Sequence, residues 1–234
     1  MREGCPLWRK EKGCPMSYEN VSDFEIRRQI VETAHLCAAA GLANAFEGNI
    51  SIRKGDRVWC TPTQTSKELL TEGQVIVLDM DGNQLEGELK PTSEILLHLV
   101  CYRERPDVSS VVHCHPIYST AFAQAGIDFV DDACPELQIL FGGKIPCIPY
   151  GTPGTPAITY GLDKVLPDYD VVLLGSHGVV AVAETPLRGY SKIQSGESIV
   201  KIYAARKELF GDKDCSLTPE ECELLKAKYF AGRK

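Results

Sequence analysis

The sequence predicts a single α/β domain with a mixed sheet, and three observations support this class. Segments with apolar residues at helical spacing alternate, within residues 22–230, with short apolar runs of strand length. Several neighbouring strand-like runs are joined by short hairpin-like turns, which favours antiparallel pairs over a doubly wound parallel sheet. The chain has 234 residues, of which 44% are apolar and 24% charged, and this composition is sufficient for a large core.

The helices are predicted from apolar periodicity and from residues that start and stop helices. Ser22 or Asp23 can cap the first helix, whose inward face begins at Ile26. Thr92 or Ser93 can cap the second. The predicted helical segments are residues 23–42, 93–106, 118–126, 151–166, 186–211 and 218–230, of which 151–166 opens with a glycine/proline turn before it continues as a helix.

The strands are predicted from runs rich in Val, Ile and Leu that are bounded by Gly, Pro, Asn or Asp. Residues 54–56 form a hairpin-like connection between the first two runs, and a DG turn follows the start of the third. The last run contains two strands around a glycine pair. The predicted strand segments are residues 49–53, 57–62, 75–87, 109–116, 144–150 and 170–184.

The net charge is −7 at pH 7, with a pI near 5.3. Nucleic acids and anionic membrane surfaces require a basic surface, so this composition argues against both as partners. No segment approaches the roughly 20 apolar residues that span a bilayer. The first residues are charged and lack an apolar run of signal-peptide length, which predicts a cytoplasmic protein.

Residues 1–20 show no periodicity and are predicted to be a loose extension of a domain at residues 21–234. Two GCP repeats place Cys5 and Cys14 in this extension, where a metal or redox role is the alternative to a loose tail. The chain has ten cysteines without a CxxC pair, and several lie in apolar runs. We therefore expect reduced cysteines that pack as small apolar residues rather than disulfides.

Three histidines occur in unusual surroundings. His113 and His115 form an HxH pair at the end of an apolar strand, and residues i and i+2 point to the same side of a strand. His177 lies between small residues at another strand end, where the backbone and the side chain can approach a site closely. Three imidazoles with an open fourth position are typical of a catalytic zinc site. From spacing alone, a metal site and a set of satisfied core histidines both stay open.

The sequence from about Gly41 to Ala183 resembles the class II aldolase/adducin family, in particular its fuculose-phosphate aldolase branch. The matching motifs are GLANAFEGNISIR, WCTPT, KPTSE, RPDVSSVVHCHP, IPCIPYGTPGT and LLGSHGVVA, in the family's order and spacing. The resemblance implies a three-layer αβα sandwich with a mixed, largely antiparallel central sheet. It also implies a homotetramer with active sites between subunits.

The resemblance implies a divalent metal, with Zn²⁺ expected and Mn²⁺, Co²⁺ or Fe²⁺ as alternatives, bound by His113, His115 and His177. It places the family's catalytic acid/base on Glu94, at the start of a helix where a carboxylate is also favoured electrostatically. Cleavage of a C–C bond beside a carbonyl leaves an enediolate, which a Lewis-acidic cation can stabilise. A nearby carboxylate can then move the proton.

The family's phosphate pocket maps onto three loops of this sequence. Glycine and hydroxyl residues at loop junctions can hold an anion through backbone amides. The chain has Gln64 where these aldolases usually carry glycine, and Lys67 nearby is read as a surface lysine or a cation for this site. The residues implied are Gly48 and Asn49 in the first loop, Thr63 and Gln64 in the second, and Thr92 and Ser93 in the third.

A second departure concerns residues 131–141, which lack the tyrosine of the fuculose-type enzymes. Glu136 instead lies at a spacing that resembles the second carboxylate of rhamnulose-phosphate aldolase. The alternative is an ordinary carboxylate at a helix start after Pro135. His35 and His98 are read as structural histidines, although His98 shares a helix face with Glu94.

The leading hypothesis is a lyase that reversibly cleaves a small ketose 1-phosphate into dihydroxyacetone phosphate and an aldehyde. A sugar-phosphate epimerase, dehydratase or decarboxylase on the same scaffold is the alternative. The retained Glu94 favours the aldolase, because the similar ribulose-phosphate epimerases carry aspartate there. A zinc hydrolase and a non-catalytic assembly module of the adducin type are further alternatives. The module has no need for three histidines and a glutamate.

Overall fold

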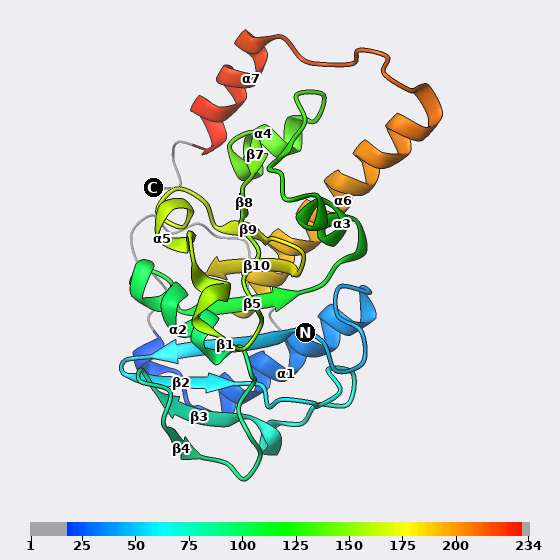
Figure 1. Ribbon diagram of the computed structural model, residues 1–234. Helices are drawn as coiled ribbons and strands as arrows, with labels where there is room; N and C mark the ends of the chain where they lie inside the picture. Colours follow the sequence, from blue (N-terminus) through cyan, green and yellow to red (C-terminus); the bar gives the residue numbers. More distant parts are fainter. Residues whose placement is uncertain (1–17, 231–234) are drawn as a thin grey trace, which may run out of the picture.

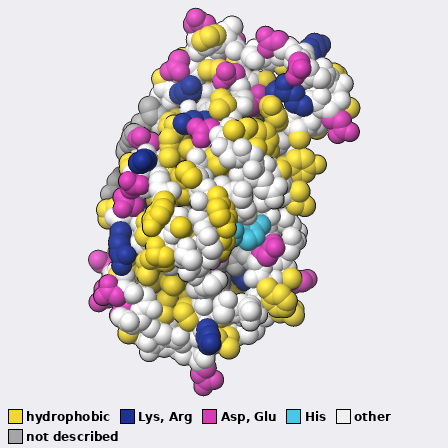
Figure 2. Space-filling model, in the orientation of Figure 1, with side chains coloured by type: hydrophobic (Ala, Val, Ile, Leu, Met, Phe, Trp, Pro, Cys, Tyr) yellow, Lys and Arg dark blue, Asp and Glu magenta, His cyan; other side chains and the backbone are white. Residues whose placement is uncertain are grey.

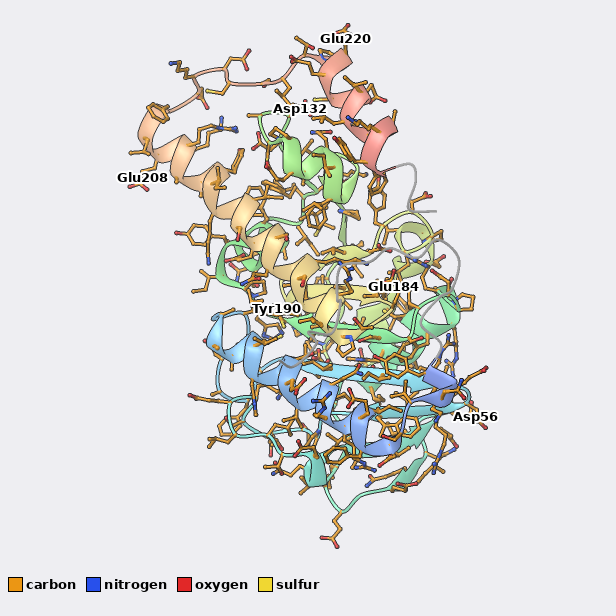
Figure 3. All side chains as sticks on the ribbon, turned by 180° about the vertical axis from the view of Figure 1, so that it is seen from behind. Asp56, Asp132, Glu184, Tyr190, Glu208 and Glu220 are labelled. Carbon is orange, nitrogen blue, oxygen red and sulfur yellow. The ribbon has the colours of Figure 1, made fainter. Side chains whose placement is uncertain are left out.

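The computed structural model describes residues 18–230, which form three layers (Figure 1). An eight-stranded sheet has the strand order β4-β3-β2-β1-β5-β10-β9-β8. Helices α1 and α6 cover one face, and Tyr190 of α6 lies close to α1 when the molecule is seen from behind (Figure 3). Helices α2 and α5 cover the other face. The predicted single-domain αβα sandwich is therefore confirmed.

Neighbouring strands of the large sheet run antiparallel, except that β8 and β9 are parallel. The expected strand at residues 144–150 is divided at Pro146, which has no N–H to continue a ladder, into β7 and β8 of two different sheets. The strands are β1 Asn49–Lys54, β2 Arg57–Cys60, β3 Ile76–Asp79, β4 Gln84–Glu86, β5 Ser110–Cys114, β6 Phe129–Val130, β7 Lys144–Ile145, β8 Cys147–Ile148, β9 Val171–Leu174 and β10 Gly178–Ala183.

The helices agree with the expected segments in all but two places: Pro135–Phe141 is helical although it was not among the predicted helices, and the segment 151–166 is divided. The single helix expected after the turn at the start of residues 151–166 is interrupted, because Gly161 takes the left-handed conformation (φ 99°) and separates the 3-10 helix Pro156–Thr159 from α5. Ser22 caps the first helix as expected, since its hydroxyl accepts from the backbone N–H of Glu25. The helices are α1 Asp23–Ala39, α2 Ile95–Glu104, α3 Ile117–Ala125, α4 Pro135–Phe141, α5 Leu162–Val165, α6 Pro186–Phe210 and α7 Pro219–Leu225.

Alternation along β5 divides the core into its two faces. Val112 and Cys114 pack in the cluster beneath α1 and α6, whereas Val111 packs in the cluster beneath α2 and α5. His113 must then point to the α2 side, because successive side chains of a strand point to opposite faces. Asn49 of β1 is the register partner of His113, so both lie at the same end of the sheet.

The boundary of the N-terminal extension differs from the expected one. Residues Tyr18–Asn20 form a 3-10 helix, and Tyr18 is buried in the core with its hydroxyl donating to Gln29 Oε1. These three residues, which were expected in the extension, therefore pack with the domain. The GCP repeats lie outside the described residues.

Two expectations concerning composition are met within residues 18–230. The eight cysteines of this range are all free, and most of them are buried among apolar side chains. None of the helices in this range combines the length and the apolar character that crossing a membrane requires.

Helix α3, which follows the HxH pair directly, is held by a buried carboxylate from α6. Glu197 accepts from the backbone N–H groups of Tyr118 (3.1 Å) and Ser119 (2.9 Å), and from the Ser119 hydroxyl (2.8 Å). These backbone groups belong to the first turn of α3, where N–H groups have no partner within the helix. Glu197 therefore acts as a capping residue supplied by another helix.

We expect Glu197→Ala to lower the free energy of unfolding by about 2–3 kcal/mol, because it leaves buried donors without an acceptor. Chemical denaturation of the two proteins measures this difference. Lys201→Ala is the matched control, because Lys201 pairs with Glu197 at 3.4 Å from a half-exposed position. An ion pair whose lysine is half exposed to solvent is expected to contribute less than about 1 kcal/mol. Equal effects of the two substitutions would contradict the capping role.

Candidate metal centre

Three imidazoles converge at one end of the large sheet. His113 is the second-last residue of β5, His115 follows that strand, and His177 lies in the β9–β10 turn. The Nε2 atom of His113 is 2.9 Å from Nε2 of His115 and 3.0 Å from Nε2 of His177. Histidine side chains are visible on the surface near this end of β5 (Figure 2), so solvent and small molecules can reach the group.

The chain approaches this group closely because Gly178 has no side chain. A Cβ atom at this position would lie 2.5 Å from Cδ2 of His115 and 2.7 Å from the carbonyl oxygen of Cys114. Any larger residue would push the β9–β10 turn away from β5. The expectation that small residues around His177 permit a close approach is confirmed.

The donor set fits a divalent metal. The Nδ1–H of His113 donates to the carbonyl of Val179 (2.9 Å), which fixes the ring with its Nε2 directed at the group. Burial, followed by the charges of His113 and His177, lowers the pKa of His115 to about 3 and keeps this ring neutral. In a tetrahedral zinc site, ligand nitrogens are about 3.3 Å apart, close to the separations observed here.

Glu94 completes the group from the opposite side. It is the N-cap residue of α2, one position before the first helical turn where we expected it. Its Oε2 lies 3.3 Å from Nε2 of His113. Its Oε1 lies 2.7 Å from Nε2 of His177, is buried, and has no hydrogen bond of normal geometry. A buried oxygen without a donor, facing three ring nitrogens, is also consistent with a cation site.

The state of Glu94 follows from two opposing effects. Burial raises the pKa of this carboxyl group, but the neighbouring His113 and His177 act in the other direction and hold the pKa well below its usual range. Glu94 is therefore ionised at neutral pH. Within residues 18–230, one oxygen of Glu94 and one nitrogen of each histidine lie within 4.8 Å of one another.

Comparison with known proteins identifies the family. The family model of the class II aldolase and adducin N-terminal domain matches residues 28–204. The chain belongs to the class II aldolase and adducin family.

Relatives within this family are named as aldolases. An L-fuculose phosphate aldolase of Escherichia coli (strain K12) is 33% identical over 161 residues, which are 67% of this chain and 72% of that protein. A 5-deoxy-D-ribulose 1-phosphate aldolase of Bacillus thuringiensis serovar kurstaki is 31% identical over 208 residues, 88% of this chain and 95% of that protein. A solved L-fuculose 1-phosphate aldolase has a TM-score of 0.80 at 26% identity and covers 92% of this chain and 99% of its own. The chain is accordingly an enzyme of the class II aldolase type.

The structure brings together the three loops that the family resemblance assigns to phosphate. The backbone N–H of Thr63 donates to the carbonyl of Lys90 (3.0 Å), which joins the second loop to the third. The backbone N–H of Lys67 donates to the carbonyl of Ala45 (3.2 Å), which joins the second loop to the first. Gly48, Asn49 and Thr92 are buried, Thr63 is half-buried, and Gln64 and Ser93 are exposed.

Gln64 takes a backbone conformation that favours glycine. Its φ of 51° lies in the left-handed region, which a residue with a Cβ atom adopts only at some energetic expense. A glycine would take this conformation without strain, and the chain instead carries an exposed amide side chain there.

Lys67 is not the surface lysine that we considered. Only 2% of the residue is exposed, and its Nζ donates to the carbonyls of Thr65 (2.8 Å) and Phe46 (3.5 Å). Burial lowers the pKa of this amine. The buried ammonium group thus connects the first loop to the second through these two hydrogen bonds. No sequence signal indicated this burial, because the residue stands in a polar stretch without periodicity.

The remaining candidates lie apart from the metal group. Glu136 is exposed in the first turn of α4, where its carboxylate accepts from the thiol of Cys134. This agrees with the helix-start alternative, and a catalytic role for Glu136 stays a prediction. His35 is exposed on α1, and its Nε2 contacts the carbonyl of Leu70. His98 is fully buried, and its Nε2 contacts Oδ1 of Asn49.

Proposed function

We propose that this protein is a divalent-metal-dependent aldehyde lyase that reversibly cleaves a small ketose 1-phosphate into dihydroxyacetone phosphate and an aldehyde. The observation that carries the proposal is the convergence of three imidazole Nε2 atoms on the ionised Glu94. The names of the relatives support an aldol reaction on a phosphorylated sugar. They differ in the sugar, so the aldehyde half is not part of the proposal.

His113, His115 and His177 would hold the metal, for which we propose Zn²⁺, with Mn²⁺, Co²⁺ and Fe²⁺ as alternatives. A divalent cation bound there would supply the Lewis acidity that stabilises negative charge on the substrate oxygens. Glu94, held between His113 and His177, would transfer the proton at the carbon beside the carbonyl. The loops around Gly48, Thr63 and Ser93 would bind the substrate phosphate through backbone and hydroxyl groups.

A homotetramer with active sites between subunits stays a prediction from the family. An epimerase, dehydratase or decarboxylase is the second candidate. It is supported by the E. coli protein YgbL, a putative aldolase/epimerase/decarboxylase whose structure has a TM-score of 0.78 at 27% identity and covers 87% of this chain and 99% of its own.

A coupled assay for dihydroxyacetone phosphate tests the proposal. Metal-loaded and chelator-treated protein are each given a panel of ketose 1-phosphates. Release that disappears with the chelator supports the aldolase, and the panel identifies the aldehyde half. If no substrate in the panel releases dihydroxyacetone phosphate while one ion is bound per chain, the aldolase proposal is wrong and the second candidate takes its place.

The phosphate loops provide a separate prediction. We expect Lys67→Met to raise the inhibition constant of inorganic phosphate and the KM of the substrate about tenfold, equivalent to about 1.4 kcal/mol. Methionine retains the apolar stem but removes the charge that connects the loops at Phe46 and Thr65. Metal content should not change, since Lys67 is not part of the metal group.

Lys54→Met is the matched control. Lys54 also donates to a backbone carbonyl, that of Val21 (2.9 Å), but lies at the other end of β1. This substitution should leave both constants unchanged. If Lys67→Met also leaves them unchanged, Lys67 has no part in anion binding.

A further inference from the structure

A buried chain of hydrogen bonds leads from Glu94 into the space between the sheet and α2. Asn49 Nδ2 donates to Glu94 Oε2 (2.9 Å), and Asn49 Oδ1 contacts His98 Nε2 (2.5 Å). His98 Nδ1 contacts Ser51 Oγ (2.7 Å), which contacts the Tyr102 hydroxyl (2.7 Å). Ser51, His98 and Tyr102 are completely buried, and Asn49 and Glu94 nearly so.

The periodicities of the two elements produce this arrangement. Asn49 and Ser51 are two residues apart on β1 and therefore share one face of the strand. Glu94, His98 and Tyr102 are spaced by four residues along α2 and share one face of the helix. Because these two faces pack against each other, polar side chains alternate between strand and helix from the metal group to the middle of the layer.

All donors and acceptors in this chain of hydrogen bonds agree with a single direction of donation, which runs from Tyr102 toward Ser51 and His98 and on to Asn49 and Glu94. Asn49 Nδ2 donates to Glu94 Oε2, so the amide oxygen of Asn49 is the atom that faces His98. Asn49 Oδ1 can only accept, so Nε2 of His98 carries the proton. Nδ1 then accepts from Ser51, whose oxygen in turn accepts from the Tyr102 hydroxyl.

His98 remains neutral, as this direction requires. Burial, followed by the charge of His113, lowers the pKa of His98 to about 3. A neutral ring has one donor and one acceptor nitrogen, and each has a buried partner here. The tautomer and the ring orientation are thus both determined by the surrounding groups.

We propose that His98 and Asn49 are positioning residues for Glu94. They bind Oε2 and thereby leave Oε1 directed at His177 and the reaction site. The proposal rests on the proposed role of Glu94 as acid/base. His98 acts only through Asn49, and Ser51 and Tyr102 act only through His98, so none of these three side chains needs to contact substrate.

Two substitutions of His98 separate a positioning role from a merely structural one. The glutamine amide can place an N–H near the position of Nε2, whereas the shorter asparagine reaches only the position of Nδ1. His98→Gln can therefore still donate to Asn49, and His98→Asn can still accept from Ser51. Both variants leave an amide in the same buried place and differ by one methylene group, which makes each the control for the other.

We expect His98→Asn to lower kcat about 10- to 100-fold, the usual effect of losing a partner that orients a group at a metal site. Its KM and its metal content per chain should stay near those of the wild type. His98→Gln should recover most of the lost kcat. Thermal unfolding of both variants corrects for the folded fraction. Equal kcat values for the two variants, whether both high or both low, would overturn the proposal.

A second measurement does not depend on activity. Nitrogen NMR of 15N-histidine-labelled, metal-free protein should show His98 protonated at Nε2 and not at Nδ1, with slow exchange of that proton. The resonance is assigned by its absence in His98→Gln. Asn49→Leu should shift it and accelerate its exchange, and the Nδ1–H tautomer in the wild type would overturn the proposal.

The two proposals fail in distinguishable ways. Wild-type protein that releases no dihydroxyacetone phosphate would reject the aldolase function. The NMR result would still decide whether the hydrogen-bonded side chains of His98, Ser51 and Tyr102 orient Asn49. Active wild-type protein with equal kcat in both His98 variants would reject the positioning role alone.

Discussion

His113→Ala is expected to abolish metal binding and, with it, activity. His113 is completely buried, and its Nε2 lies within about 3 Å of the ring nitrogens of both His115 and His177, so its loss removes the centre of the donor set. Two remaining imidazoles do not provide the three protein ligands of a catalytic zinc site. Turnover should fall at least about 10³-fold, because electrostatic stabilisation is usually the largest contribution to catalysis.

Metal analysis of purified protein, together with the assay for dihydroxyacetone phosphate, measures both effects. His35→Ala is the control, because His35 is exposed on α1 and lies outside the metal group. It should retain one ion per chain and wild-type turnover. A full complement of metal in His113→Ala would show that the three histidines are not the ligands.

The metal group could be anticipated because it depends mainly on local geometry. The two-residue period of a strand brings His113 and His115 to one site wherever an HxH pair ends a buried strand. The small residues around His177 indicated a close approach, and Gly178 shows why this was needed. The likeness of the motifs to a known family then connected segments that are far apart in the sequence.

Local patterns were misleading where one residue changes the backbone. The segment 151–166 has helical periodicity, but the left-handed Gly161 interrupts it. The run at 144–150 has strand composition, but Pro146 cannot donate to a neighbouring strand, and two short strands result. In both cases a single residue that is visible in the sequence overrides the apolar periodicity around it.

The roles of His98 and Lys67 could not be predicted, because they depend on how separate elements pack. The helical spacing showed that His98 and Glu94 share a face. It did not show that Asn49 and Ser51 of β1 would meet that face. The burial of Lys67 arises from the carbonyls of two loops, and no sequence pattern specifies the paths of those loops.

Glu94→Gln is expected to retain the metal and to lose most turnover. Glutamine has nearly the same shape and can still accept from Asn49 Nδ2, but it cannot take up or release a proton at neutral pH. The three histidines are unchanged, so metal content should remain one ion per chain. Loss of general acid–base catalysis typically lowers kcat about 10²- to 10⁴-fold, and we expect an effect in this range.

Glu104→Gln is the matched control, since it removes an exposed carboxylate at the other end of the same helix. The pKa of Glu94 is held below its usual range, so the wild-type carboxylate is ionised across neutral pH and available as a base. The comparison of kcat at equal metal occupancy then isolates proton transfer from metal binding. Full turnover in metal-loaded Glu94→Gln would exclude Glu94 as the acid/base, and with it the reason for a buried chain of polar side chains to hold one of its oxygens.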